Sequence, residues 1–182
     1  MQQATSKLTY SDYVLLPDDG KRYEIVEGEL YMTPAPMTRH QLLVSRLNHL
    51  LVAYLEARPI GVAFPAPCDV LLSDHDIVQP DLLVVLEGGT ARITEKNVQG
   101  PPDLVIEILS PGTAARDRDL KRKRYEHFGV REYWLVDPDL NTVEILRLES
   151  GQYRRAGLVE GSGTLTSPLF PGLTLDLRTI LR

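Results

Sequence analysis

Two short, uninterrupted apolar runs constrain the fold of this chain more than any other feature. Residues 82–86 read Leu-Leu-Val-Val-Leu, and residues 104–109 read Leu-Val-Ile-Glu-Ile-Leu. A strand with one face in water alternates apolar and polar residues, whereas a strand covered on both faces is apolar throughout. We therefore expect both runs to be inner strands of a sheet that is sandwiched between other layers.

The remaining segments supply helices and further strands around this sheet. Thr38–Ala57 carries apolar residues at helical spacing and so presents one buried face. Residues 114–128 form a second predicted helix, and Gly129 is well placed to end it in the left-handed conformation. A short helix is predicted to begin at a cap, Thr9 or Ser11, and to stop near Pro17. Residues 22–26 and 29–32 are predicted to form a hairpin closed by Glu27-Gly28. A strand over 66–72 and a hairpin of residues 133–136 and 143–148 complete the shorter elements. The prediction is one domain over residues 1–182, of the α/β (α+β) class, with a mixed β-sheet flanked by helices and extra N- and C-terminal strands.

Composition is that of an ordinary globular protein, with 43% apolar and 25% charged residues. The first residues show no apolar run after a basic start, so we expect no signal peptide. No stretch reaches the roughly eighteen apolar residues of a membrane span. Cys68 is the single cysteine, which excludes an internal disulfide and suits a reducing compartment. We expect a cytoplasmic protein that makes no membrane contact.

Two carboxylates stand where carboxylates are costly. Glu107 lies inside the second apolar run, and Asp81 follows Pro80 and opens the first. A buried ionised carboxylate needs a cation, a basic side chain or a proton. If the two strands lie side by side, both acids can reach one metal, and Mg²⁺ suits such a site because it binds through one or two carboxylates and keeps several waters. The alternative is that Asp81 caps a turn while Glu107 forms an ion pair in the core.

A lysine on the following helix strengthens the first of these interpretations. Asp117, Lys121 and Tyr125 are spaced four residues apart and share one helical face. If that face packs on the strand of Glu107, the ammonium group of Lys121 comes near the acids. Positive charge there would stabilise the negative charge that develops in a phosphodiester transition state. The competing interpretation is an ordinary surface pair between Asp117 and Lys121.

The same helix is locally basic in a chain whose net charge is −5. Between residues 116 and 131 there are seven arginines and lysines against three acids. Phosphate contacts dominate the affinity of proteins for nucleic acids, so such a patch could bind a nucleic-acid backbone. A solvated helix face laced with ion pairs explains the same pattern.

Several motifs occur in the order that is typical of a known family. They are residues 22–30 (Arg-Tyr-Glu-Ile-Val-Glu-Gly-Glu-Leu), 78–83 (Val-Gln-Pro-Asp-Leu-Leu), 102–111 (Pro-Asp-Leu-Val-Ile-Glu-Ile-Leu-Ser-Pro), the helix from Asp117 to Lys121 with Tyr125, and 129–138 (Gly-Val-Arg-Glu-Tyr-Trp-Leu-Val-Asp-Pro). Over nearly its whole length the chain resembles the Uma2 family (DUF820) of restriction-type endonucleases within the PD-(D/E)XK nuclease superfamily. The resemblance implies a restriction-endonuclease-like fold.

The resemblance also assigns roles to individual residues. Asp81 and Glu107 would be the carboxylate ligands of Mg²⁺, or of Mn²⁺ as a substitute, and the backbone carbonyl of Ile108 would add a third oxygen. The lysine of the superfamily motif would fall at position 109, where this chain has Leu109; Lys121 on the next helix would replace it.

Two further residues, Glu24 and His40, match positions that recur near the family's site. Taken alone, His40 is more typical of a capping or surface residue, and Glu24 of a solvent-facing strand residue. The substrate would be nucleic acid, with DNA favoured, contacted through Arg118, Arg122, Lys123 and Arg124.

Other functions stay open at this stage. The chain could keep the fold as a nucleic-acid-binding module without cutting, because the standard lysine position is lost and fold does not imply function. It could also hydrolyse another phosphoester, with the basic helix serving only solubility. A third interpretation is an assembly partner, since the hairpin around Trp134 could form the surface of a homodimer.

Overall fold

The computed structural model describes residues 7–181, and its centre is a six-stranded sheet in the order β12-β11-β10-β9-β6-β3. Its strands are β3 (Gly61–Pro65), β6 (Leu82–Leu86), β9 (Leu104–Ile108), β10 (Glu132–Asp137), β11 (Thr142–Glu149) and β12 (Gln152–Glu160). Only β9 and β10 run parallel, and the other neighbours are antiparallel. The two apolar runs are thus the adjacent inner strands β6 and β9, which confirms the prediction of a mixed sheet.

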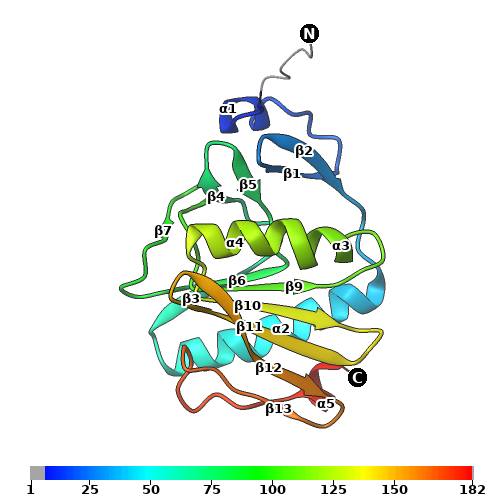
Figure 1. The fold of residues 1–182 in the computed structure, drawn as a ribbon, viewed down its shortest axis with the longest axis vertical. Helices are drawn as coiled ribbons and strands as arrows, with labels where there is room; N and C mark the ends of the chain where they lie inside the picture. The colour runs from blue at the N-terminus through cyan, green and yellow to red at the C-terminus, as the bar shows by residue number, and fades with distance from the viewer. Residues whose placement is uncertain (1–6, 182) are drawn as a thin grey trace.

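Helices cover both faces of this central sheet (Figure 1). Leu47 and Leu51 of the long helix α2 (Thr38–Ala57) belong to the same apolar cluster as Leu82 and Val84 of β6. On the opposite face, Tyr125 of α4 (Arg122–Phe128) belongs to the cluster that holds the alternate β6 residues. Since successive side chains of a strand point to opposite faces, both sets must be apolar when both faces are covered. Because both faces of the sheet are covered, β6 shows no alternation of apolar and polar residues.

A second six-stranded sheet carries the N-terminal hairpin, in the order β2-β1-β5-β4-β8-β7. Its strands are β1 (Arg22–Val26), β2 (Glu29–Thr33), β4 (Val70–Ser73), β5 (Asp76–Val78), β7 (Arg92–Ile93) and β8 (Val98–Gln99). Glu27 and Gly28 join β1 to β2 with positive φ angles of 56° and 83°. This is the conformation of a two-residue hairpin turn, as predicted. Figure 1 places this sheet at the N-terminal end of the molecule.

The remaining elements are short. They are α1 (Tyr10–Tyr13), α3 (Ala114–Arg116), a π-helical turn (Asp117–Lys121), α5 (Leu177–Leu181) and the paired strands β13 (Thr164–Leu165) and β14 (Leu175–Asp176). Thr9 caps α1 through reciprocal hydrogen bonds with Asp12, as its sequence indicates. Within residues 7–181, no helix is long and apolar enough to cross a membrane.

Several boundaries differ from the sequence prediction. The first helix ends at Tyr13 and not near Pro17. The strand expected over residues 66–72 begins only at Val70, because the preceding segment contains Pro67, which has no N–H for a strand ladder. The helix expected over residues 114–128 is continuous in direction but contains the π-helical turn at Asp117–Lys121. A π turn accommodates one extra residue, and hydrophobic periodicity does not reveal it.

Candidate active site

The pairing of β6 with β9 brings the two acids of the apolar runs together. Leu82 lies opposite Ile106 in this antiparallel pair, and one step further along the same register Asp81 meets Glu107. The backbone N–H of Asp81 donates to Oε2 of Glu107 over 3.4 Å. Both side chains are at least nine-tenths buried, and both point to the face that α4 covers. Neighbouring strands therefore place two carboxylates side by side, as the sequence pattern suggested.

Lys121 reaches these acids from the π-helical turn. Its Nζ lies 2.5 Å from Oε1 of Glu107 and 3.8 Å from Oδ1 of Asp117, and the side chain is only 3% exposed. Burial alone would lower the pKa of Lys121, but the surrounding carboxylates raise this pKa well above its ordinary value. The ammonium group is therefore charged across the physiological range. Leu109, at the position of the superfamily lysine, is instead buried in the apolar cluster beside Tyr125.

Glu24 of β1 is the second close partner of Lys121. Its Oε1 accepts hydrogen bonds from Nζ of Lys121 and from the backbone N–H of Gln79, both over 2.9 Å. Its Oε2 lies 3.5 Å from the guanidinium of Arg116. Burial alone would raise the pKa of Glu24, yet these donors hold it below its ordinary value. Glu24 is thus a buried, ionised residue that fixes Lys121, and the alternative of a solvent-facing strand residue is wrong for it.

Glu107 and Asp117 differ electrostatically from Glu24. Burial raises the pKa of Glu107 well above its ordinary range, against the attraction of Lys121, and nearby carboxylates raise it further. The hydroxyl of Tyr125 donates to Oε1 of Glu107 over 2.9 Å. Burial also raises the pKa of Asp117. More carboxyl groups are packed here than Lys121 alone can neutralise, so a second cation would stabilise their ionised forms.

His40 approaches Asp81 from the first turn of α2. Its Nε2 lies 2.9 Å from Oδ2 of Asp81, and the same oxygen accepts the backbone N–H of Ile108 over 2.9 Å. His40 is therefore neither a helix cap nor a free surface residue. The carboxylate of Asp81 is held by a ring nitrogen on one side and by β9 on the other.

The donor set is suited to a hard divalent cation that needs few protein ligands. Hydrogen bonds to Asp81 converge on Oδ2, whereas Oε2 of Glu107 receives only the long bond from the Asp81 backbone. Oδ1 of Asp81 and Oε2 of Glu107 thus accept at most one hydrogen bond each from the described residues. Among residues 7–181, no group of three or more histidine, cysteine or acidic side chains is arranged to hold a metal. Mg²⁺ could use such a donor set, because it binds through one or two carboxylates and completes its shell with water.

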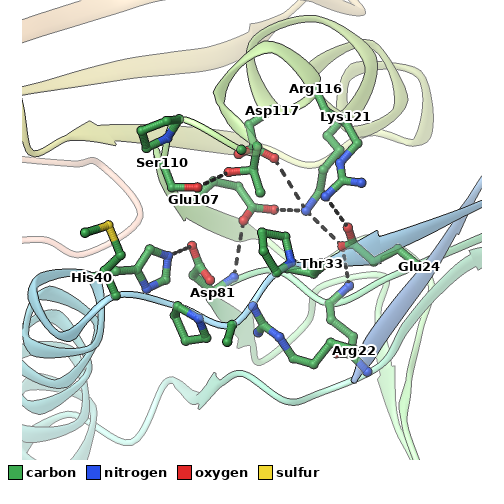
Figure 2. Close-up of a pocket in the computed structure, with 18 residues that line it drawn as sticks. Arg22, Glu24, Thr33, His40, Asp81, Glu107, Ser110, Arg116, Asp117 and Lys121 are labelled. Carbon is green, nitrogen blue, oxygen red and sulfur yellow. Dashed lines mark hydrogen bonds and ion pairs between the residues drawn. The ribbon is translucent and has the colours of Figure 1, made fainter. Parts of the chain in front are cut away.

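A cavity of about 280 Å³ opens onto these side chains (Figure 2). Its walls include the segment from Thr33 to Met37, which leads into α2, and the loop from Ser110 to Thr113, which follows β9. Figure 2 shows Asp81 and His40 on one side of Glu107, with Lys121 and Glu24 on the other. The acids and the lysine are thus open to a ligand although each is nearly buried.

The four basic residues assigned to nucleic acid lie outside this cavity. Arg118 pairs with Asp137 over 2.8 Å, and Lys123 pairs with Asp119 over 2.7 Å. Arg124 binds Asp76 through both Nε and Nη2 and also contacts Glu27. Arg122 is exposed. Three of these four side chains already have acidic partners, and their contact with nucleic acid stays a prediction.

Two arginines of the cavity wall were absent from the sequence prediction. Arg22 lies two residues before Glu24 on β1, and Arg116 lies one residue before Asp117. The period of a strand puts Arg22 and Glu24 on one face, and this signal was available in the sequence. No comparable signal marked Arg116, because only the folded chain brings its guanidinium to Glu24 of β1.

Comparisons with known proteins identify the family and the fold of this chain. The model of the Uma2 family, described as "Putative restriction endonuclease", matches residues 10–178. A crystal structure from Anabaena variabilis ATCC 29413, described as a putative nuclease belonging to DUF820, superimposes with a TM-score of 0.79. It is 22% identical, and the match covers 96% of this chain and 97% of that one, so the likeness shows a shared fold.

A protein of Synechocystis sp. (strain ATCC 27184 / PCC 6803 / Kazusa), described as uncharacterized, is 23% identical over 116 residues. That match spans 64% of this chain and 60% of the relative's length. The family model covers nearly the whole chain, including every residue of the cluster from Glu24 to Lys121. This chain belongs to the Uma2 family.

Proposed function

We propose that this protein is a metal-dependent endonuclease that hydrolyses phosphodiester bonds of nucleic acid, with DNA as the favoured substrate. The observation that carries the proposal is the meeting of Asp81, Glu107 and Lys121 at one cavity, with Nζ of Lys121 2.5 Å from Glu107. Two carboxylates and an ammonium group supply the charges that phosphodiester hydrolysis requires. Membership of a family whose description is "Putative restriction endonuclease" supports the same reaction class.

Asp81 and Glu107 would hold Mg²⁺ or Mn²⁺, with the carbonyl of Ile108 as the further oxygen. The bound ion would lower the pKa of a water molecule and neutralise charge on the phosphate. Lys121 keeps a permanent positive charge beside the reacting group, and Glu24 holds that charge in place through its 2.9 Å contact. His40 orients the Asp81 carboxylate, in the way that partners of metal ligands commonly do.

Cleavage assays with purified protein test this proposal directly. Plasmid DNA, a short duplex, single-stranded DNA and RNA are incubated with Mg²⁺, Mn²⁺ or EDTA. We expect cleavage only with a divalent cation, and loss of cleavage in Asp81→Asn, Glu107→Gln and Lys121→Met. If Lys121→Met cuts at the wild-type rate, the assignment of the displaced lysine is wrong.

A matched control comes from the neighbouring strand. Glu132 on β10 is 1% exposed and pairs with Arg147 over 2.9 Å, but it does not line the cavity. Glu132→Gln removes a buried, ion-paired carboxylate of the same kind as Glu107→Gln does. We expect Glu132→Gln to lower stability while the cleavage rate per folded molecule stays at the wild-type value.

A second candidate is a binding module that keeps the fold without hydrolysis. The observation in its favour is that three carboxylates already surround Lys121, so the ammonium group has partners without any substrate. DNA binding with no cleavage under any divalent metal would favour this module. Cleavage of small phosphoesters without salt-dependent binding to DNA or RNA would instead indicate a hydrolase of another class.

A further inference from the structure

The cavity at Asp81 and Glu107 adjoins a second cavity of about 460 Å³. Both cavities are lined by Arg22, His40, Asp81 and the segment of residues 33–36. The two spaces therefore meet along that segment, and Arg22 lies with Asp81 at their junction. A chain-like ligand that occupies the first cavity has a path into the second past the guanidinium of Arg22.

Arg22 is a half-buried cation without an acidic partner. Within residues 7–181, its side chain makes no ion pair and no hydrogen bond. This differs from Arg118 and Arg124, whose guanidinium groups bind carboxylates. Figure 2 shows the side chain of Arg22 extending from β1 toward Asp81. Its five N–H donors are thus available at the edge of the acidic cluster.

Arg116 stands on the wall formed by the helix and is held in one orientation. Its guanidinium lies 5.1 Å from the centre of the Tyr31 ring and 3.5 Å from Oε2 of Glu24. Its side chain is 14% exposed, and within the described residues its buried Nε has no hydrogen-bond partner. Arg116 therefore combines a fixed position with unused donor capacity.

The charge balance of the cavity indicates which ligand these arginines suit. Four nearly buried carboxylates belong to it, those of Glu24, Asp81, Glu107 and Asp117. Lys121 is enclosed by three of them and is 3% exposed, so it cannot extend to a neighbouring phosphate. A nucleic-acid strand that enters the cavity therefore needs positive charge beside the phosphates that neighbour the reacting one. Guanidinium groups suit this task because their planar donors match phosphate oxygens in pairs.

We propose that Arg22 and Arg116 form a phosphate subsite that binds the backbone phosphate adjacent to the one at Asp81 and Glu107. This inference rests on the proposed function and assigns the substrate's path through its site. Arg22 is a positioning residue that fixes the register of the strand across the carboxylates. Arg116 supplies the second guanidinium from the opposite wall.

Binding of a fluorescently labelled DNA duplex, measured by anisotropy in EDTA over a range of NaCl concentrations, tests the subsite without cleavage. We expect Arg22→Gln to weaken binding by about tenfold or more, the scale of one lost charge-assisted contact. The magnitude of the slope of log affinity against log salt concentration should decrease by roughly 0.9, the contribution of one phosphate contact. Arg22→Lys should keep the slope and regain part of the affinity, because it retains the charge without the planar pair of donors.

Two controls separate this effect from damage to the fold. Arg22→Gln should melt at the wild-type temperature, since no ion pair is lost. Arg178→Gln removes an exposed arginine that pairs with Asp176 and lines neither cavity. We expect Arg178→Gln to bind with wild-type affinity and salt slope.

A scan with single neutral methylphosphonate linkages then locates the contact. One linkage next to the cut should weaken wild-type binding but leave binding by Arg22→Gln unchanged, because the variant has already lost that contact. A purely structural role of Arg22 would not produce this coupling. If every linkage weakens both proteins equally, the subsite is overturned.

The outcomes distinguish the subsite from the nuclease proposal. If wild-type protein cuts DNA and Arg22→Gln binds and cuts equally well, the subsite is wrong and the nuclease stands. If wild-type protein cleaves no DNA with any of the divalent metals, yet Arg22→Gln weakens DNA binding and lowers the salt slope, the subsite stands and the nuclease proposal fails. If wild-type protein binds no nucleic acid at low salt, both are overturned.

Discussion

Replacing Lys121 by methionine should be among the most destabilising single changes at the site. Methionine keeps the length and apolar stem of the side chain but removes the charge that Glu24, Glu107 and Asp117 surround. Breaking a buried pair from one side typically costs about 3–5 kcal/mol, because the remaining charges are left without compensation. A domain is usually stable by about 5–15 kcal/mol, so the variant should still fold at neutral pH.

The pH dependence of this loss follows from the pKa shifts. In the wild type, the lowered pKa of Glu24 contributes stability above the unfolded pKa, and this contribution is lost as pH falls through the folded pKa. Without Lys121, burial raises the pKa values of all three carboxylates, which can then become neutral by binding protons. The difference in unfolding free energy should therefore be largest near pH 7.5 and should shrink as pH falls toward and below about 4.5, the ordinary carboxylate range.

Urea denaturation in EDTA, followed by circular dichroism at pH 7.5 and pH 4.5, measures this difference. Lys123→Met is the matched control, since Lys123 pairs with Asp119 at the same spacing but both side chains are about 70% exposed. The control should lose no more than about 0.5 kcal/mol. The double variant Lys121→Met/Glu24→Gln should recover part of the loss by removing one unpaired charge. A loss below about 1 kcal/mol that does not vary with pH would refute the electrostatic argument.

Three further perturbations give distinct expectations. His40→Gln should lower Mg²⁺-dependent cleavage by about 10–100-fold through looser orientation of Asp81, which a titration of rate against metal concentration would detect; an unchanged curve would contradict the role of His40. Tyr125→Phe removes the donor to Glu107 and should cost about 1–3 kcal/mol in urea denaturation; no loss would mean that this buried hydrogen bond adds nothing. Gly28→Ala forces a side chain onto a φ of +83° and should lower the unfolding free energy by about 1–2 kcal/mol, so an equal denaturation midpoint would show that the turn relaxes.

The sequence was sufficient to predict that Asp81 and Glu107 need compensation, because a carboxylate in an apolar run leaves a clear pattern, but the pattern alone left a metal site and a core ion pair both open. A charged residue inside an uninterrupted apolar run, as at Glu107, must be compensated wherever the run lies. The predicted sheet then needed only to place two such runs side by side. The bounds of Thr38–Ala57 were predicted to the residue, because its apolar face repeats over five turns.

The features that the sequence could not predict depend on contacts between distant segments. Charge alone did not show that Arg118 pairs with Asp137 of β10, or that Arg124 pairs with Asp76 of β5. The basic helix therefore looked freer than it is. The strand period could have placed Arg22 on the face of Glu24, but only the folded cavity shows that the side chain of Arg22 lacks an acidic partner among the described residues.

The π-helical turn has a consequence for insertions and deletions in this chain. One residue advances an α-helix by about 100°. A π turn already absorbs its extra residue in one wider turn, so removing Leu120 would let the segment close into a regular α-helix without rotating the preceding turn relative to Tyr125. Asp117 and Lys121, which lie inside the π turn, would change position. A relative that lacks one residue at this place should therefore arrange its acidic cluster differently, even where it keeps the acids and the lysine of the site.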